Sequence, residues 1–125
     1  IKATLIDGTS FNSRDLAGKP LIVHFWTTWC PTCKAEATNI EAISEEHEVV
    51  SIAVNSGSNS LLKKYMRENG YHFRVVNDAE GRWAEIFHVE VFPTTFIFDS
   101  KGKLRFTEVG YTTTLGLKGR LGVLK

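Results

Sequence analysis

Apolar and polar residues alternate along the chain in blocks that predict strands and helices in turn. The apolar run Leu21–Trp26 begins after Pro20 and predicts a strand that is covered on both faces, because both of its sides carry apolar residues. Residues 31–46 change to a helical period, and Pro31 suits the first turn of a helix, where its missing N–H is not needed. Residues 49–54 predict a second buried strand.

The second half of the chain continues this alternation. Ser58, Asn59 or Ser60 can cap a helix that ends at Gly70, because their side chains bind free N–H groups and glycine suits a helix C-terminus. The further elements that we expect are a strand over 73–76, a helix over 78–87, a strand over 94–98, its antiparallel partner over 103–109, a weak glycine-containing helix from Thr112 and an edge hairpin within 2–11. The order β-α-β-α-β-α-β-β-α implies parallel strands with right-handed crossovers and an antiparallel edge. We therefore predict an α/β fold with a central mixed sheet flanked by helices on both faces.

Length and composition favour a single globular domain over residues 1–125. Apolar residues make up 42% and charged residues 23% of the chain, which excludes disordered and fibrous classes. The formal net charge of +1 is too balanced for a nucleic-acid-binding protein. No apolar run is long enough to span a bilayer. The chain begins with Ile1 rather than Met, so we expect that an upstream segment, such as an N-terminal membrane anchor, has been removed.

The two cysteines, Cys30 and Cys33, carry most of the chemical information. A single pair does not make a disulfide scaffold, and a bridge across so short a loop removes little entropy from the unfolded chain. Cys30 lies between the predicted strand and helix, where the free N–H groups and the helix dipole stabilise a thiolate, the nucleophilic form. Cys33 is placed to attack a mixed disulfide at Cys30 and so close a redox-active disulfide. The spacing favours redox chemistry.

A metal site is the competing interpretation of this pair. Zinc normally requires four ligands, and although His47 is suitably spaced from Cys33, the next histidine, His72, is too distant to complete a zinc motif. A two-coordinate Cu(I) site needs only two thiolates, so Cu(I) handling by Cys30 and Cys33 stays open. We expect no bound cofactor and no other metal site.

The segment around the cysteines resembles a known active site. The stretch Phe25-Trp26-Thr27-Thr28-Trp29-Cys30-Pro31-Thr32-Cys33-Lys34-Ala35-Glu36 resembles the active-site segment of thioredoxin-fold proteins. It is most similar to the TlpA/ResA-like branch, which includes cytochrome c maturation reductases and suppressor-of-copper-sensitivity proteins. The element order agrees over nearly the whole chain. The resemblance implies a thioredoxin-like fold in a periplasmic or otherwise extracytoplasmic protein, often tethered to the membrane. It also implies disulfide exchange with protein thiols, among them a membrane or periplasmic redox partner.

The same resemblance implies roles for residues outside the cysteine pair. Val91-Phe92-Pro93-Thr94-Thr95-Phe96 resembles the cis-proline loop of the fold. A cis bond before Pro93 would leave backbone groups of Phe92 and Thr94 free to bind an extended partner segment. Glu36 matches an acidic residue that the family carries near the buried cysteine, where a carboxylate can accept the proton of Cys33. The alternative for Glu36 is an exposed acid that the helix dipole favours.

Neighbouring residues complete the expected site. His24 lies six residues before the first cysteine, where thioredoxins carry a buried acidic residue, so the chain departs from that pattern. A neutral imidazole can shuttle a proton, whereas the more common alternative is a histidine that is hydrogen-bonded in the core. Trp29 is expected to be exposed, to shield the thiolate and, with Pro31 and Thr32, to contact partners. Trp26 is expected in the core.

These expectations describe a monomeric thiol–disulfide oxidoreductase that uses Cys30 and Cys33 as a reductant of partner proteins. The residues between the cysteines, Pro31 and Thr32, do not by themselves decide between reductant and oxidant. A Cu(I)-handling module is the alternative that uses the same cysteines. A pure binding adaptor on this fold would not need a reactive pair.

Overall fold

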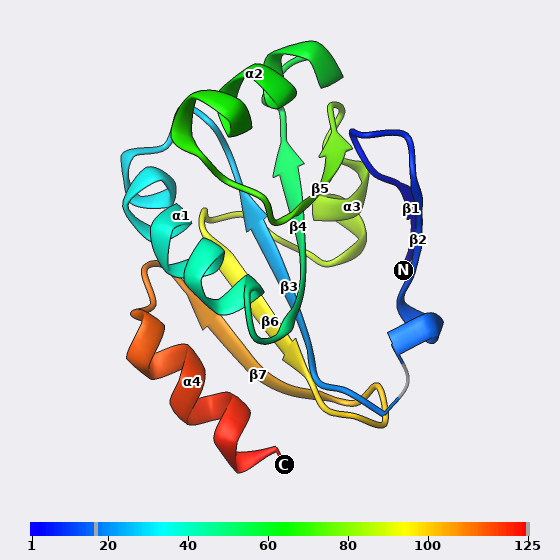
Figure 1. Cartoon of the computed structure of the whole chain (residues 1–125), viewed down its shortest axis with the longest axis vertical. Helices are drawn as coiled ribbons and strands as arrows, with labels where there is room; N and C mark the ends of the chain where they lie inside the picture. The colour runs from blue at the N-terminus through cyan, green and yellow to red at the C-terminus, as the bar shows by residue number, and fades with distance from the viewer. Residues whose placement is uncertain (17, 125) are drawn as a thin grey trace.

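The computed structural model describes residues 1–16 and 18–124, and its main feature is a five-stranded sheet in the order β5-β4-β3-β6-β7. In chain order the elements are β1 (Lys2–Thr4), β2 (Ser10–Asn12), the 3-10 helix η1 (Ser13–Leu16), β3 (Leu21–Trp26), α1 (Pro31–Ser44), β4 (Glu48–Val54), α2 (Asn59–Asn69), β5 (Arg74–Asp78), α3 (Arg82–Ile86), β6 (Thr94–Phe98), β7 (Leu104–Val109) and α4 (Thr114–Val123). Figure 1 shows the sheet running through the middle of the molecule, with α1 and α4 along one side.

The position of β3 at the centre of the sheet follows from its composition. All 6 residues of β3 are buried, and the strand pairs in parallel with β4 and antiparallel with β6. β5 extends the sheet in parallel with β4, and β7 extends it antiparallel to β6. A strand that is apolar on both sides is stable only inside a sheet whose two faces are covered. The predicted mixed sheet with an antiparallel edge is confirmed.

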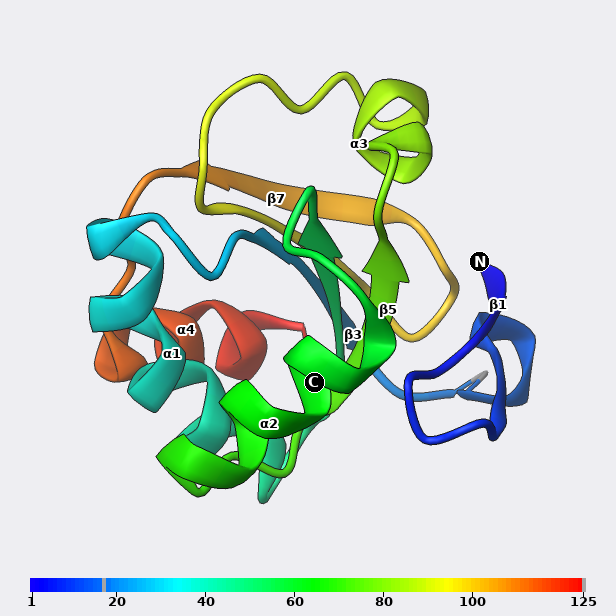
Figure 2. The ribbon, with the colours of Figure 1, turned by 90° about the horizontal axis from the view of Figure 1, so that it is seen from above.

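Alternate residues of β3 face two separate apolar cores. Ile22 and Trp26 face α1, α2 and α4. The helices contribute to that core Ile40, Ile43, Leu62, Met66, Leu117 and Leu121. Leu21, Val23 and Phe25 face the opposite side. The core there also contains Leu5, Phe11 and Ala84. Figure 2 shows α1, α2 and α4 on one side of the sheet and α3 on the other, so helices flank both faces as predicted.

The two edges of the sheet are occupied differently. Beside β5, the N-terminal segment adds a bridge between Leu5 and Val76, and the Ile6 N–H donates to the Val75 carbonyl at 3.0 Å. The expected hairpin within 2–11 forms as a separate two-stranded sheet of β1 and β2. At the other edge, no strand lies beyond β7 within the described residues. β7 is therefore the edge strand whose outer backbone groups remain open to other chains.

One predicted helix is shorter than its sequence pattern indicates. A helix was expected over 78–87, but Asp78 is the last residue of β5. Its carboxylate accepts the N–H groups of Trp83 at 3.1 Å and Ala84 at 3.0 Å. Asp78 therefore binds the free donors of the helix from the end of the preceding strand, and α3 begins only at Arg82.

The ends of α2 and α4 follow from their caps. The Ser58 hydroxyl accepts the N–H of Leu61 at the start of α2, and Gly70 ends this helix with a φ of 68°. The last helix was expected from Thr112, but the Thr113 hydroxyl accepts the N–H of Gly116, which makes Thr113 the N-cap. None of the described helices combines the length and the apolar character that crossing a bilayer requires.

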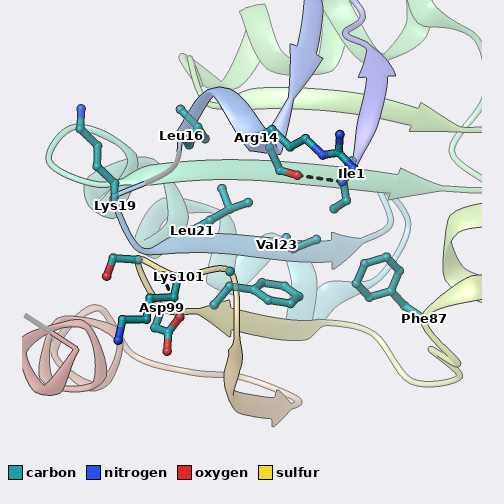
Figure 3. Close-up of a pocket in the computed structure, with 13 residues that line it drawn as sticks. Ile1, Arg14, Leu16, Lys19, Leu21, Val23, Phe87, Asp99 and Lys101 are labelled. Carbon is teal, nitrogen blue, oxygen red and sulfur yellow. Dashed lines mark hydrogen bonds between the residues drawn. The ribbon is translucent and has the colours of Figure 1, made fainter.

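A pocket of about 480 Å³ lies on the face of the sheet opposite α1 (Figure 3). Leu21 and Val23 of β3 line it together with Phe87, and Lys19 and Lys101 lie at its rim. Leu21 is the first residue of β3 and pairs with the last residue of β6. The pocket therefore lies at the start of β3. The cysteine pair lies at the opposite end, after the loop that follows Trp26.

Candidate active site

Cys30 and Cys33 lie where the loop after β3 enters α1. Cys30 is the N-cap of α1 with an extended backbone (φ −93°, ψ 119°), and Pro31 occupies the first helical position. The Cys30 carbonyl accepts the N–H of Lys34 at 3.0 Å, which closes the first turn. Both cysteines are free thiols, Cys30 partly exposed and Cys33 buried. The cap position predicted for Cys30 is confirmed.

The surroundings of Cys30 favour its thiolate. Partial burial raises the pKa of the Cys30 thiol, but hydrogen bonds to its sulfur from Cys33 and Thr32 outweigh burial, and the pKa falls below its usual value. These donors belong to the first turn of α1, whose N–H groups have no partner within the helix. As a thiol, Cys30 donates to the Phe92 carbonyl oxygen at 3.7 Å. Cys30 is therefore placed to be the nucleophile.

The surroundings of Cys33 act in the opposite direction. Burial raises the pKa of the Cys33 thiol to about 12, although the Thr27 N–H acts to lower it, and the Cys30 sulfur adds to the rise. The side chain is 1% exposed. Cys33 is therefore a protonated thiol at a pH where Cys30 is already reactive. It needs a nearby proton acceptor before it can attack another sulfur.

A second loop places Phe92 and Pro93 beside the cysteine pair. The Phe92–Pro93 peptide bond is cis, as the sequence predicted. Phe92 is half-buried and carries the carbonyl that receives the Cys30 thiol, although the two residues are 62 positions apart. Thr94 is the first residue of β6 and is buried, and its hydroxyl donates to the Val91 carbonyl at 2.6 Å. The loop thus brings Phe92 to the site, while the Thr94 side chain points into the protein.

Three other residues that were expected to contact partners are exposed beside the cysteines, namely Trp29, Pro31 and Thr32. Trp29 is 61% exposed, and its indole N–H donates to the Asn55 carbonyl at 3.1 Å. This hydrogen bond holds the ring at the surface. Trp26, by contrast, is 1% exposed and belongs to the core, as predicted.

Glu36 is fully buried in α1, three residues after Cys33. Residues at this spacing lie on one helix face, so the carboxyl and the Cys33 thiol share the buried face of α1. Oε1 of Glu36 accepts the N–H of Thr112 at 2.5 Å. Burial raises the pKa of the Glu36 carboxyl to about 7, while the Thr112 hydrogen bond acts to lower it. The alternative of an exposed acid is excluded, and this carboxyl can exchange a proton near neutral pH.

His24 is 1% exposed and lies on the face of β3 beneath α1. Its Nδ1 is 3.1 Å from Oγ1 of Thr95 and 3.4 Å from Oε2 of Glu36. Burial lowers the pKa of the His24 imidazole to about 3, so the ring is neutral at physiological pH. The expectation of a hydrogen-bonded core histidine is confirmed. His24 is thus the third buried titratable group of the site, after Cys33 and Glu36.

Several hydrogen-bonding partners of the site were missed by sequence reasoning. Thr95 lies opposite His24 in the pairing of β3 with β6, and only the strand register reveals this. Thr112 acts through its backbone, which has no signal in the sequence. The loop that carries it is fastened to α1 by Asn39, whose amide donates to the Thr112 carbonyl at 3.0 Å and to the Tyr111 hydroxyl at 2.9 Å.

The chain is similar to known redox proteins in sequence and in fold. A family model described as Redoxin matches residues 2–118. A thioredoxin-like protein of Haemophilus influenzae is 39% identical over 124 residues, which cover 96% of this chain and 74% of that protein. The sporulation thiol-disulfide oxidoreductase A of Bacillus subtilis is 32% identical over 108 residues, which cover 81% of this chain and 66% of that protein. The crystal structure of a secreted Mycobacterium tuberculosis disulfide oxidoreductase superposes with a TM-score of 0.84 at 25% identity, covering 99% of this chain and 96% of that one.

Proposed function

The chain belongs to the Redoxin family and is a thiol–disulfide oxidoreductase, and from this premise we propose that it acts outside the cytoplasm as a reductant of protein disulfides. The observation that carries the exchange chemistry is the asymmetry of the two thiols, while the reductant direction rests on the family resemblance. Cys30 is partly exposed with a lowered pKa, whereas Cys33 is buried with a raised pKa. Disulfide exchange in either direction uses this division between an accessible nucleophile and a protected resolving thiol. The secreted mycobacterial relative supports the location.

In the proposed reaction the Cys30 thiolate attacks one sulfur of a partner disulfide. A bond forms between Cys30 and that sulfur, the partner's S–S bond breaks, and the second partner sulfur leaves as a thiolate with the bonding electron pair. Cys33 then loses its proton and attacks the Cys30 sulfur, which forms the Cys30–Cys33 disulfide and releases the first partner sulfur as a thiolate. The partner gains two electrons and the cysteine pair loses two. One of the two released thiolates can take up the Cys33 proton and the other a proton from solvent.

Glu36 is the proton acceptor for the resolving step in this scheme. The Cys33 thiol, with a pKa of about 12, is almost fully protonated at neutral pH. The Glu36 carboxyl, with a pKa of about 7, is present in comparable amounts as acid and as carboxylate. A base whose pKa lies near the working pH is efficient in both directions, so the same group can return the proton when the disulfide is reduced again.

Exposed apolar side chains on the segments that border the cysteine pair, here called the apolar rim, suit a protein partner. Its members and their exposed fractions are Trp29 (61%), Val91 (53%), Val109 (65%) and Tyr111 (50%). Gly110 donates its N–H to the Pro93 carbonyl at 2.7 Å, which ties the end of β7 to the proline loop. Exposed apolar side chains gathered around a reactive group are typical of a surface that binds another protein. We place the extended segment of the partner along Phe92, inside this rim.

The cycle closes only when the Cys30–Cys33 disulfide is reduced again. A membrane-bound or periplasmic thiol protein is the proposed source of these two electrons. Tethering at the membrane, which the family resemblance implies, would keep the domain close to such a donor. We propose that the domain works as a monomer.

A glutathione redox titration of the cysteine pair tests the direction of the reaction. A reductant should have a midpoint near that of thioredoxin, about −270 mV, whereas a midpoint near that of DsbA, about −120 mV, would mark an oxidant and overturn the proposal. Trapping provides the matched control. Cys33→Ser should accumulate a mixed disulfide between Cys30 and a reducible substrate such as insulin, and Cys30→Ser should not.

Cu(I) handling is the alternative function on the same two sulfurs. Within residues 1–16 and 18–124, no three His, Cys, Asp or Glu side chains are grouped so that they could hold a metal ion. Two thiolates suffice for linear Cu(I) coordination, so Cys30 and Cys33 alone would have to provide it. Titration of the reduced protein with Cu(I) against a competing chelator distinguishes the two functions. Tight binding of one equivalent, together with no exchange of disulfides, would replace the redox proposal.

A further inference from the structure

A polar band crosses the sheet beneath α1. Ser51, His24 and Thr95 lie side by side in register on β4, β3 and β6, and all three are buried. On β3 the histidine stands between Ile22 and Trp26, which belong to the apolar core. An imidazole in such surroundings is stabilised only by the hydrogen bonds that it makes. The hydrogen-bonding partners of His24 therefore indicate the role of its imidazole.

His24 meets Glu36 at the oxygen that no backbone group binds. Oε1 of Glu36 accepts the Thr112 N–H at 2.5 Å, while Oε2 is buried without a hydrogen-bond partner among the described residues. Nδ1 of His24 lies 3.4 Å from that oxygen. Catalytic hydrogen bonds are often long before substrate binds and shorten as charge develops. The imidazole is thus the polar group placed to respond when Glu36 changes its protonation state.

The buried surroundings select the tautomer of His24. With its proton on Nδ1, the ring can donate to Thr95 Oγ1, has Glu36 Oε2 within 3.4 Å of the same nitrogen, and leaves Nε2 as an unpaired acceptor. With its proton on Nε2, the ring would bury a donor that has no partner in the described part of the chain. Buried donors without a partner are rarer than acceptors without one. The Nδ1–H tautomer is therefore the favoured one.

We propose that His24 is a positioning residue for Glu36: its Nδ1–H donates to Oε2, orients the carboxyl on the helix face that carries Cys33, and stabilises the ionised form that accepts the thiol proton. The inference rests on the role of Glu36 in the function proposed above. A neutral donor suits this position, because a cationic imidazole would hold the carboxylate in its charged form and weaken it as a base.

The other charged groups near Glu36 leave this assignment in place. On α1 the titratable neighbour is Cys33, whose proton Glu36 takes. Glu108 of β7, which is in register with Thr95, and Arg120 of α4 form an ion pair with each other. β6 presents the neutral Thr95, and the loop before α4 presents the Thr112 N–H. Loss of the His24 donor should therefore act directly on the titration of the Glu36 carboxyl.

Carboxyl ¹³C NMR of reduced protein labelled at glutamate measures this titration. His24→Phe keeps a ring but removes the donor, and it should raise the midpoint of Glu36 by about one pH unit, the value of one hydrogen bond to a charged group. His24→Asn places an amide nitrogen close to the position of Nδ1 and should restore the midpoint. His47→Phe, which changes a histidine outside the band, is the control and should leave it unchanged. A Glu36 midpoint that is equal in wild type and His24→Phe would overturn the proposal.

The resolving step provides a kinetic measurement of the same coupling. A mixed disulfide of Cys30 with thionitrobenzoate is prepared, and release of the coloured thiol by Cys33 is followed against pH. At pH 6 the release should be about tenfold slower in His24→Phe than in wild type, and the pH profile should move upward with the Glu36 midpoint. His24→Asn should restore both. A profile that does not move would contradict the positioning role.

A measurement on the unmodified protein keeps the proposal testable if His24→Phe does not fold. Long-range ¹⁵N NMR should show a protonated Nδ1 and a bare Nε2, with the Nδ1 signal moving as Glu36 titrates. A bare Nδ1 throughout that range would overturn the assignment. The redox function itself would fail in a different way, through absence of disulfide exchange by the wild-type protein, and neither NMR measurement depends on that exchange.

Discussion

At Glu36, burial and hydrogen bonding act on one carboxyl in opposite directions. The buried site disfavours the charged form, the Thr112 N–H favours it, and the resulting pKa is about 7. The unfolded chain has the ordinary value of 4.5, so between these two pH values the folded protein retains a proton that the unfolded chain has lost. The contribution of this proton to stability is fully present below pH 4.5 and is lost as the pH rises through about 7.

Glu36→Gln should remove this dependence, because the amide stays neutral at every pH. Relative to wild type, the free energy of unfolding of the variant should rise between pH 4 and pH 8 by on the order of 3 kcal/mol, the equivalent of the shift from 4.5 to about 7. Urea unfolding of both reduced proteins at pH 4, 6 and 8 measures the difference. Glu46→Gln, an exposed change, is the control. A difference that stays constant with pH would contradict the raised pKa.

The same substitution should slow the chemistry at neutral pH. Without a carboxylate beside it, Cys33 must give its proton to water, so the resolving step in Glu36→Gln should be about a hundredfold slower than in wild type. The initial attack by Cys30 should be unaffected. Stopped-flow measurement of the two phases separates them, and a resolving phase with an unchanged pH profile would remove Glu36 from the mechanism.

The two cysteines should differ in their reaction with alkylating agents. Cys30 is partly exposed and its pKa is lowered, whereas Cys33 is buried and its pKa is about 12. Brief treatment of the reduced protein with iodoacetamide at pH 7 should therefore label Cys30 and leave Cys33 intact. Peptide mass spectrometry identifies the labelled residue. Preferential labelling of Cys33 would mean that the assignment of nucleophile and resolving thiol is reversed.

At the scale of elements, α4 contains Gly116, Gly119 and Gly122 but also supports the loop whose Thr112 binds Glu36. A Cβ added at Gly119 meets no atom within 4 Å, and the residue is helical, so Gly119→Ala should stabilise the protein by about 0.5–1 kcal/mol. Gly70, with a φ of 68° after α2, is the contrasting position, and Gly70→Ala should destabilise by a similar amount. Urea unfolding at pH 7 compares the two. Destabilisation by Gly119→Ala would show that α4 needs this glycine.

Elements could be predicted from the sequence wherever one local pattern decides them. β3 and β6 have their predicted bounds, because each is an apolar run closed by polar or turn residues. α3 was predicted too long, since the carboxylate of Asp78 caps it from the end of β5. In the active site, likewise, only the features that a local sequence pattern decides could be predicted. The cap position of Cys30 follows from its neighbours in the sequence, whereas the contact of His24 with Glu36 depends on how α1 lies across β3, which only the packed structure reveals.

At the scale of the whole molecule, β7 reaches from the turn at one end of the sheet to the cysteine pair at the other. Val109 ends the strand in register with Thr94 and belongs to the apolar rim, while Leu104 begins it in register with Phe98. Both side chains are exposed, Val109 at 65% and Leu104 at 48%. The two residues therefore form a matched pair on one strand. Val109 lies at the end near the reactive sulfurs, and Leu104 lies at the opposite end.

Val109→Ser should slow the reduction of a protein disulfide such as that of insulin by several-fold, because it removes apolar contact area from the rim. It should leave the reaction with a small disulfide unchanged. Leu104→Ser should change neither reaction. Comparing initial rates with both substrates tests this, and an equal effect of the two substitutions would argue against docking at the rim.

The unequal edges of the sheet also limit how copies of this chain can associate. Two molecules could join by pairing their β7 strands, but the joined sheet would then end at both sides in β5, where the segment around Leu5 already lies. Further copies that add to β5 would meet the segment around Leu5, which already covers part of that edge. Arg105 and Glu108 also place charges on β7, which disfavours close pairing. Extension of the five-stranded sheet at β5 would therefore require the N-terminal segment to detach first.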